Sequence, residues 1–197
     1  MERFSRDVLW RRVTSDGIEH VLLDDAEGLR ARGTMTAAEP QPYTCRYSLA
    51  TNQQWVVTTL EVETEGAGWR RRVRLERDSS GWRITANEHG DLEPSLPGIE
   101  APEVLNAAVD PDLGFSPLFN TLPVRRLDLM GQPTGTSETL MMAFIIVPSL
   151  VVTPSEQTYT VMGDGRIGYT SGTFTAELQF DPDGYVRHYP GLATRIV

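Results

Sequence analysis

The feature that most constrains this chain is the alternation of apolar and polar residues in short segments along its whole length. Residues 43–49 place alternate apolar side chains on one face, and residues 174–180 repeat the pattern. A period of two is typical of β-strands that bury one face. The alternation predicts an all-β fold with at most one or two short helices. We expect strands at residues 8–13, 18–24, 28–36, 43–49, 55–65, 69–77, 82–86, 138–147, 157–162, 166–170, 174–180 and 185–189.

These strands predict a large antiparallel meander in two runs. A long twisted sheet must curl strongly to cover its edges and its apolar face, so we expect an open or closed barrel-like sheet. A chain of 197 residues suits one β domain, residues 1–197. Proline and glycine are frequent at about residues 88–120. We interpret that segment as a crossover within the domain, because the strands on either side are too few for two independent cores.

One hairpin has charges that suggest its register. Gly66-Ala67 is predicted to be the two-residue loop of the hairpin, because a type II′ turn has glycine first. This loop sets Glu63 opposite Arg70 and Glu61 opposite Arg72. The arginines of this strand then face glutamates instead of lying free. The sequence therefore argues against a nucleic-acid site here.

Composition limits the partners and the compartment. The net charge is −9, with arginine as the only strongly basic residue type, which argues against nucleic acid as a default partner. The longest apolar run, residues 140–148, is too short to span a bilayer. Residues 1–10 lack the apolar core of a signal peptide, and the single Cys45 cannot form an internal disulfide. These features predict a cytoplasmic protein.

Residues 109–129 mix acids, prolines, aromatics and two adjacent arginines without a clean period. One helical turn is possible around residues 116–120, with Ser116 as its cap and Pro117 in the first helical position. From Pro123 onward, alternation predicts a strand that places Arg125 on the same face as Leu127 and Leu129.

The same stretch carries a resemblance. Its Asp-x-Asp-Leu and Ser-Pro pairs, and above all the residues Asn-Thr-Leu-Pro-Val-Arg-Arg-Leu at 120–127, resemble the signature of the bacterial putative glycolipid-binding family. The likeness runs from about Trp10 to Arg195 and includes residues 174–178, Asp181, Gly184 and 189–191. The resemblance implies a strongly curved, barrel-like sheet, related in shape to bacterial lipoprotein carriers, and a lipid or glycolipid-like ligand.

Arg125 is the most informative candidate site residue, because its guanidinium would lie on an apolar face. One interpretation is a buried ion pair with Asp110 or Asp112. The other is an anchor for an anionic or hydroxylated head group. Further candidate ligand-binding residues are Arg71, Tyr47, Trp55 and Tyr189, and the candidate structural network comprises Asp110, Asp112, Asn120 and Arg126.

Motifs of catalysis and cofactor binding are missing. The sequence has no Gly-x-Ser-x-Gly elbow, phosphate loop or metal-spaced histidine pair, so we predict no catalytic residue, metal or cofactor. Three function classes remain. The favoured one is a protein that holds an amphiphile in the cavity of a curved sheet. The others are a structural or protein-interaction module with a filled interior and, less favoured, an enzyme acting on a small amphiphile.

Overall fold

The computed structural model describes residues 4–92 and 95–197. Within these residues fourteen strands form one sheet, accompanied by one α-helix and two short 3-10 helices. The elements are β1 Arg6–Arg12, β2 Gly17–Asp24, β3 Arg30–Ala37, β4 Tyr43–Thr51, β5 Val57–Gly66, β6 Trp69–Asp78, β7 Gly81–Gly90, η1 Pro102–Leu105, β8 Ala108–Leu113, α1 Leu118–Arg126, η2 Leu129–Gly131, β9 Ser137–Ile145, β10 Val152–Gly163, β11 Arg166–Ser171, β12 Phe174–Phe180, β13 Val186–Tyr189 and β14 Ala193–Arg195.

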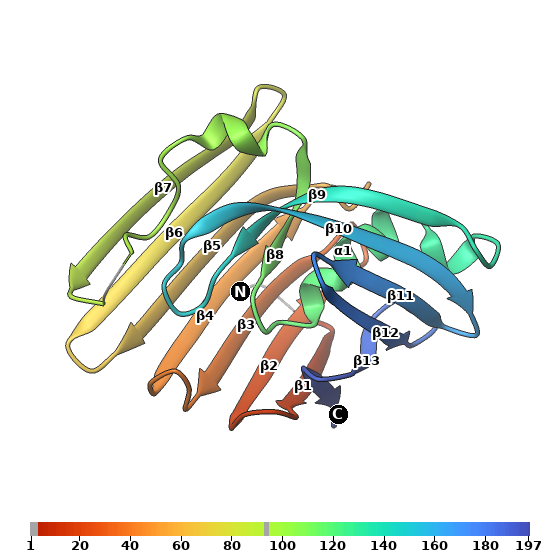
Figure 1. Cartoon of the computed structure of the whole chain (residues 1–197), viewed down its shortest axis with the longest axis horizontal. Coiled ribbons are helices and arrows are strands. Elements are labelled where there is room, and N and C mark those ends of the chain that lie inside the picture. The colour runs from red at the N-terminus through yellow and green to blue at the C-terminus, as the bar shows by residue number, and fades with distance from the viewer. Residues whose placement is uncertain (1–3, 93–94) are drawn as a thin grey trace.

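The sheet contains two antiparallel meanders, β1–β7 and β9–β14, which join where β1 pairs with β14 (Figure 1). Its strand order is β7-β6-β5-β4-β3-β2-β1-β14-β13-β12-β11-β10-β9-β8. Only the last pair, β8 with β9, is parallel among the pairings of the described strands. The predicted all-β class and strong curvature are confirmed. The sheet is the open form, with β7 and β8 as its edges.

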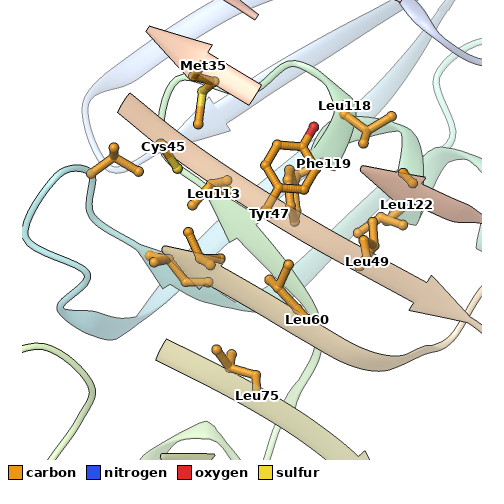
Figure 2. Close-up of a cluster of buried hydrophobic side chains, with 14 of the residues drawn as sticks. Met35, Cys45, Tyr47, Leu49, Leu60, Leu75, Leu113, Leu118, Phe119 and Leu122 are labelled. Carbon is orange, nitrogen blue, oxygen red and sulfur yellow. The ribbon is translucent and has the colours of Figure 1, made fainter. Parts of the chain in front are cut away.

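The chain itself fills the concave face of the first meander. Buried side chains of β4, β5 and β6 meet the apolar side chains of β8 and α1, as Figure 2 shows. Tyr47 and Phe119 make an edge-to-face contact at 5.4 Å between ring centroids. Full burial of a side chain such as Phe119 contributes about 1.5–3 kcal/mol. The residues that meet here include Tyr47, Leu49, Leu60, Leu75, Leu113, Leu118, Phe119 and Leu122.

The strand predicted from Pro123 is wrong, because this segment is the second half of α1. Every residue from Leu118 to Val124 is buried, and a helix that is apolar on most sides is stable when protein surrounds it. Burial outweighs the backbone hydrogen bond that Pro123 cannot donate. The expected cap is also wrong: α1 begins after Pro117, and the Ser116 hydroxyl donates to the Glu19 carboxylate instead.

The predicted register of the β5–β6 hairpin is wrong by two residues. Glu63 lies opposite Arg72, and Glu65 lies opposite Arg70, across a loop of Ala67 and Gly68. Gly68 adopts a φ of 82°, which a residue with a Cβ rarely tolerates, so the turn uses the second glycine of the sequence and not the first. A shift of two residues keeps each side chain on its predicted face.

Candidate functional site

A cavity of about 580 Å³ lies between the β8–α1 connection and the second meander. Its walls come from the strands β8 to β13, from α1 and the residues that connect β8 to it, and from the loop after β3. This volume is within the usual range for small-molecule sites. The lining residues are Pro40, Asp112, Leu113, Gly114, Phe115, Ser116, Asn120, Phe144, Ile146, Val147, Ser155, Gln157, Tyr169, Ser171, Phe174, Tyr189 and Leu192.

Aromatic rings form one wall of this cavity. Tyr169 lies 5.8 Å from Tyr189 and 6.1 Å from Phe174, measured between ring centroids, and Phe174 lies 6.2 Å from Tyr189. Phe174 is 46% exposed although it is a large apolar residue. Exposed apolar surface gathered in a concavity marks a place where a ligand or partner can be buried.

Phe115 brings a further exposed ring to the cavity. It is 40% exposed, and its backbone adopts a φ of 69°. A bulky residue in this left-handed region costs about 1–3 kcal/mol, so the surrounding structure must hold it there. The residue follows β8 directly, and Gly114 donates a backbone hydrogen bond to Ile145 at 2.9 Å. Attachment of this corner to β9 therefore fixes the place of the Phe115 ring.

The cavity has a polar end, built as a chain of hydrogen bonds. The Gln157 amide donates to Asp112 at 2.6 Å, and the Tyr159 hydroxyl donates to the Gln157 carbonyl oxygen at 2.9 Å. Asn120 donates to the Tyr159 hydroxyl at 3.0 Å. Burial raises the pKa of Asp112 to about 6, against the hydrogen bond from Gln157, which lowers it. This end offers a carboxyl group, an amide and hydroxyls to a hydroxylated ligand.

Of the five residues predicted to bind a ligand, Tyr189 lines this cavity and the other four lie elsewhere. Tyr47 and Trp55 are buried in the core of the first meander, at 4% and 8% exposure. Asp112 and Asn120, predicted as parts of a structural network, also line the cavity.

The predicted partner of Arg125 is wrong. Arg126 is the arginine that binds Asp110, with its Nη2 atom 2.6 Å from Oδ2. Arg125 instead donates to the backbone carbonyl of Asp183 and lies 4.3 Å from the centre of the Trp55 ring. Adjacent side chains on a helix point about 100° apart, so Arg125 and Arg126 reach different partners.

Arg71 is almost fully buried, at 3% exposure, under the segment that follows β7. Its guanidinium donates to the backbone carbonyls of Ser149, at 3.0 Å, and Leu92, and forms an ion pair with Glu88 at 3.1 Å. These bonds connect β6 with the loops that cross it. The contacts satisfy the buried charge within the protein.

A second polar centre, around Glu19, has no precedent in the sequence analysis. The Glu19 carboxylate accepts hydrogen bonds from Tyr47 at 2.7 Å and Ser116 at 2.5 Å, and burial raises its pKa to about 7. Gly33 lies opposite Tyr47, where an added Cβ would lie 2.0 Å from the ring. Glycine therefore lets the ring lie across β3 and reach Glu19 on β2. Glutamate within an alternating strand carries no signal that it is buried.

Several cavity residues could have been found from one signal. Residues 140–148 form the longest apolar run of the sequence, and Phe144 and Ile146, which belong to this run, line the cavity. Gln157, Ser155 and Ser171 carried no comparable signal, because polar residues in an alternating strand ordinarily face solvent. Among the described residues no helix is long and apolar enough to cross a membrane, and no three potential metal-ligating side chains form a cluster.

Known proteins resemble this chain in fold and in sequence. A crystal structure of a DUF1089 family protein from Pseudomonas aeruginosa, at 1.80 Å resolution, has a TM-score of 0.74 to it and 24% sequence identity, covering 100% of this chain and 99% of that one. This likeness supports a single β domain of the same fold. No curated protein matches the chain. Residues 7–195 match the family described as putative glycolipid-binding, and the chain belongs to that family.

Proposed function

We propose that this protein binds an amphiphile, of the lipid or glycolipid class, in the cavity beside the β8–α1 corner. The observation that carries the proposal is a cavity of about 580 Å³ lined both by aromatic rings, among them the exposed ring of Phe174, and by the hydrogen-bonded pair Asp112 and Gln157. Membership of the putative glycolipid-binding family supports a lipid-binding role. The family description names no specific ligand, so we infer the ligand class from the residues that line the cavity.

The arrangement suits a molecule with two unlike ends. The rings of Phe115 and Phe174 and the side chain of Ile146 offer apolar surface that an alkyl chain or the apolar face of a sugar ring can cover. Asp112 and Gln157 offer acceptors and a donor for hydroxyl groups. A hydroxylated head group satisfies these groups without bringing a second charge beside the buried carboxyl.

A second candidate is a structural or protein-interaction module, and one observation favours it. The concave face of the first meander, where a barrel-like carrier would hold its ligand, is filled by β8 and α1. On this hypothesis the cavity beside β9 is a surface hollow without a ligand. Binding measurements distinguish the two candidates.

The proposal is tested by titrating the protein with dodecyl maltoside, below the critical micelle concentration of this detergent, and measuring the heat of binding by isothermal calorimetry. We expect saturable binding, weakened about tenfold by Phe174→Ala, because the ring contributes roughly 1–2 kcal/mol of buried apolar surface. Met162→Ala is the matched control, since Met162 is 41% exposed on β10 and does not line the cavity.

Two results would overturn the proposal. One is the absence of saturable binding for dodecyl maltoside and also for shorter and longer alkyl glycosides. The other is binding that Phe174→Ala and Met162→Ala weaken equally, because the ligand would then lie outside this cavity.

A further inference from the structure

Arg12, the last residue of β1, is a buried cation without an acidic partner in contact. Its exposure is 7%, and it donates a hydrogen bond to the Tyr43 hydroxyl at 2.8 Å. The guanidinium also lies over the Phe115 ring, 4.1 Å from the centroid. Across residues 4–92 and 95–197, no carboxylate forms an ion pair with it within 4.0 Å.

This arrangement is unusual because buried charges are normally paired. Among the described residues the other buried arginine, Arg71, follows the rule and pairs with Glu88, and the partly buried Arg126 pairs with Asp110. Contacts with aromatic faces and one neutral hydroxyl compensate the charge of Arg12 only in part. Glu19 acts on this cation through space but makes no ion pair with it.

Arg12 lines a groove of about 580 Å³ at one end of the sheet. The groove is separate from the cavity described above and is formed by the turn between β1 and β2 and by the residues at the turn between β3 and β4. A Cβ added to Gly17 would lie 2.7 Å from Cδ of Arg12, so the arginine side chain lies directly against the start of β2. The groove contains Arg11, Arg12, Ser15, Asp16, Gly17 and Tyr43 among its lining residues.

We propose that this groove is an anion-binding site in which the Arg12 guanidinium is the principal ligand for a phosphate group. A guanidinium presents donors in a planar fork that fits two oxygens of one phosphate. The Tyr43 hydroxyl accepts from Arg12 and retains its own proton to donate to the anion. A bound phosphate would supply the negative charge that the protein does not place beside Arg12.

The phosphate has two possible sources, a free phosphate ion or the head group of a lipid. Phe115 lies between the two sites, because its ring packs on Arg12 and also lines the cavity. A phosphorylated amphiphile could therefore reach the groove from the cavity, and a free phosphate could enter from solvent. The site does not depend on whether the cavity binds a sugar.

Calorimetric titrations with inorganic phosphate and with monododecyl phosphate test this site. We expect at least one of them to bind the wild-type protein, and Arg12→Met to weaken that binding about ten- to a hundredfold, the value of one or two charged hydrogen bonds. Arg187→Met is the matched control, since it removes one exposed positive charge from β13. It should change the affinity by less than about twofold.

Two further variants keep the test valid if Arg12→Met does not fold. Arg12→Lys retains the charge without the planar fork, and Tyr43→Phe removes the hydroxyl that orients Arg12. Each should bind the probe more weakly than the wild type does, because each removes part of the hydrogen bonding to the anion. Binding of both probes, or of inorganic phosphate alone, supports a free-phosphate site, and binding of monododecyl phosphate alone supports a lipid head group.

The proposal is overturned if neither probe binds, or if the folded Arg12 and Tyr43 variants bind like the wild type. Titration with dodecyl maltoside, which carries no charge, tests ligand binding in the cavity independently of anion binding at Arg12. If the maltoside binds and the phosphates do not, the cavity proposal stands and the Arg12 site is wrong.

Discussion

The guanidinium of Arg126 binds the carboxylate of Asp110 through Nε and Nη2, at 3.1 Å and 2.6 Å from Oδ2. Asp110 is fully buried and belongs to β8, whereas Arg126 is the last residue of α1. The pair therefore fixes the end of the helix to the edge strand, from a position 16 residues later in the chain. This ion pair thus connects the two ends of the segment from β8 to α1, which fills the concave face of the first meander.

Replacement of Arg126 by methionine leaves a buried carboxylate without its cation. We expect Arg126→Met to lower the free energy of unfolding by about 3–5 kcal/mol, measured by urea denaturation. Arg125→Met is the matched control on the same helix, because the Arg125 side chain is 30% exposed and its partners are the Trp55 ring, the Asp183 carbonyl and, at 3.8 Å, the partly exposed carboxylate of Asp25. Its loss should cost about 1–2 kcal/mol. Equal losses would show that the Asp110 pair has no special role.

The strands were predictable because each buries one face, and that geometry leaves an alternating pattern in the sequence. The segment predicted at residues 43–49 is observed as β4, Tyr43–Thr51. β8 left no such pattern, since Asp110, Pro111 and Asp112 are all buried. A proline also argues against a central strand, but β8 is an edge of the sheet, where the missing N–H costs little. Local patterns could not reveal which strand is an edge.

The candidate site was less predictable, because curvature of the sheet brings distant residues together. Asp112 lies on β8 and Gln157 on β10, two strands that do not pair with each other, yet the Gln157 amide nitrogen lies 2.6 Å from the Asp112 carboxylate. The prediction of α1 failed for the same reason: its helical form depends on burial against the first meander. Arg12 and Phe115 are likewise neighbours only in the folded chain.

Engineered disulfides test the corrected register of the β5–β6 hairpin. Directly opposite residues in an antiparallel pair have Cα atoms about 4.5–5.5 Å apart, which suits a disulfide, whereas diagonal neighbours lie farther apart. The double variant Glu63→Cys/Arg72→Cys should therefore oxidise readily under mild conditions. Glu63→Cys/Arg70→Cys, the pair that the sequence predicted, should retain free thiols. Faster oxidation of the second variant, counted by thiol titration, would restore the original register.

Tyr159 connects two polar groups of the cavity's buried end. Tyr159→Phe removes the hydroxyl that donates to Gln157 and accepts from Asn120, and so leaves a buried acceptor and a buried donor unpaired. We expect a loss of about 1–3 kcal/mol in the free energy of unfolding. Ser137→Ala, which removes an exposed hydroxyl contact with Thr160, should cost less than about 0.5 kcal/mol. Similar losses for both variants would mean that the buried chain of hydrogen bonds adds nothing to stability.

The buried Glu19 carboxyl predicts a dependence of stability on pH. Its pKa is raised from 4.5 to about 7, mainly by burial, while Ser116, Tyr47 and Arg12 oppose the shift. Between these two values the folded protein holds a proton that the unfolded chain has released. Stability must therefore fall as the pH rises through this window, by up to about 1.4 kcal/mol per pH unit for this one group.

Glu19→Gln removes this titration while it preserves the size of the side chain and an oxygen that can accept from Ser116 and Tyr47. Relative to the wild type, the variant should gain stability progressively from pH 4.5 to pH 7, by roughly 3 kcal/mol in total, and the difference should become constant above that range. Urea denaturation of both proteins at half-unit intervals from pH 4 to pH 8 measures it. The difference between them isolates Glu19 from Asp112, whose titration is common to both proteins. A difference that does not change with pH would mean that Glu19 has an ordinary pKa in the folded protein.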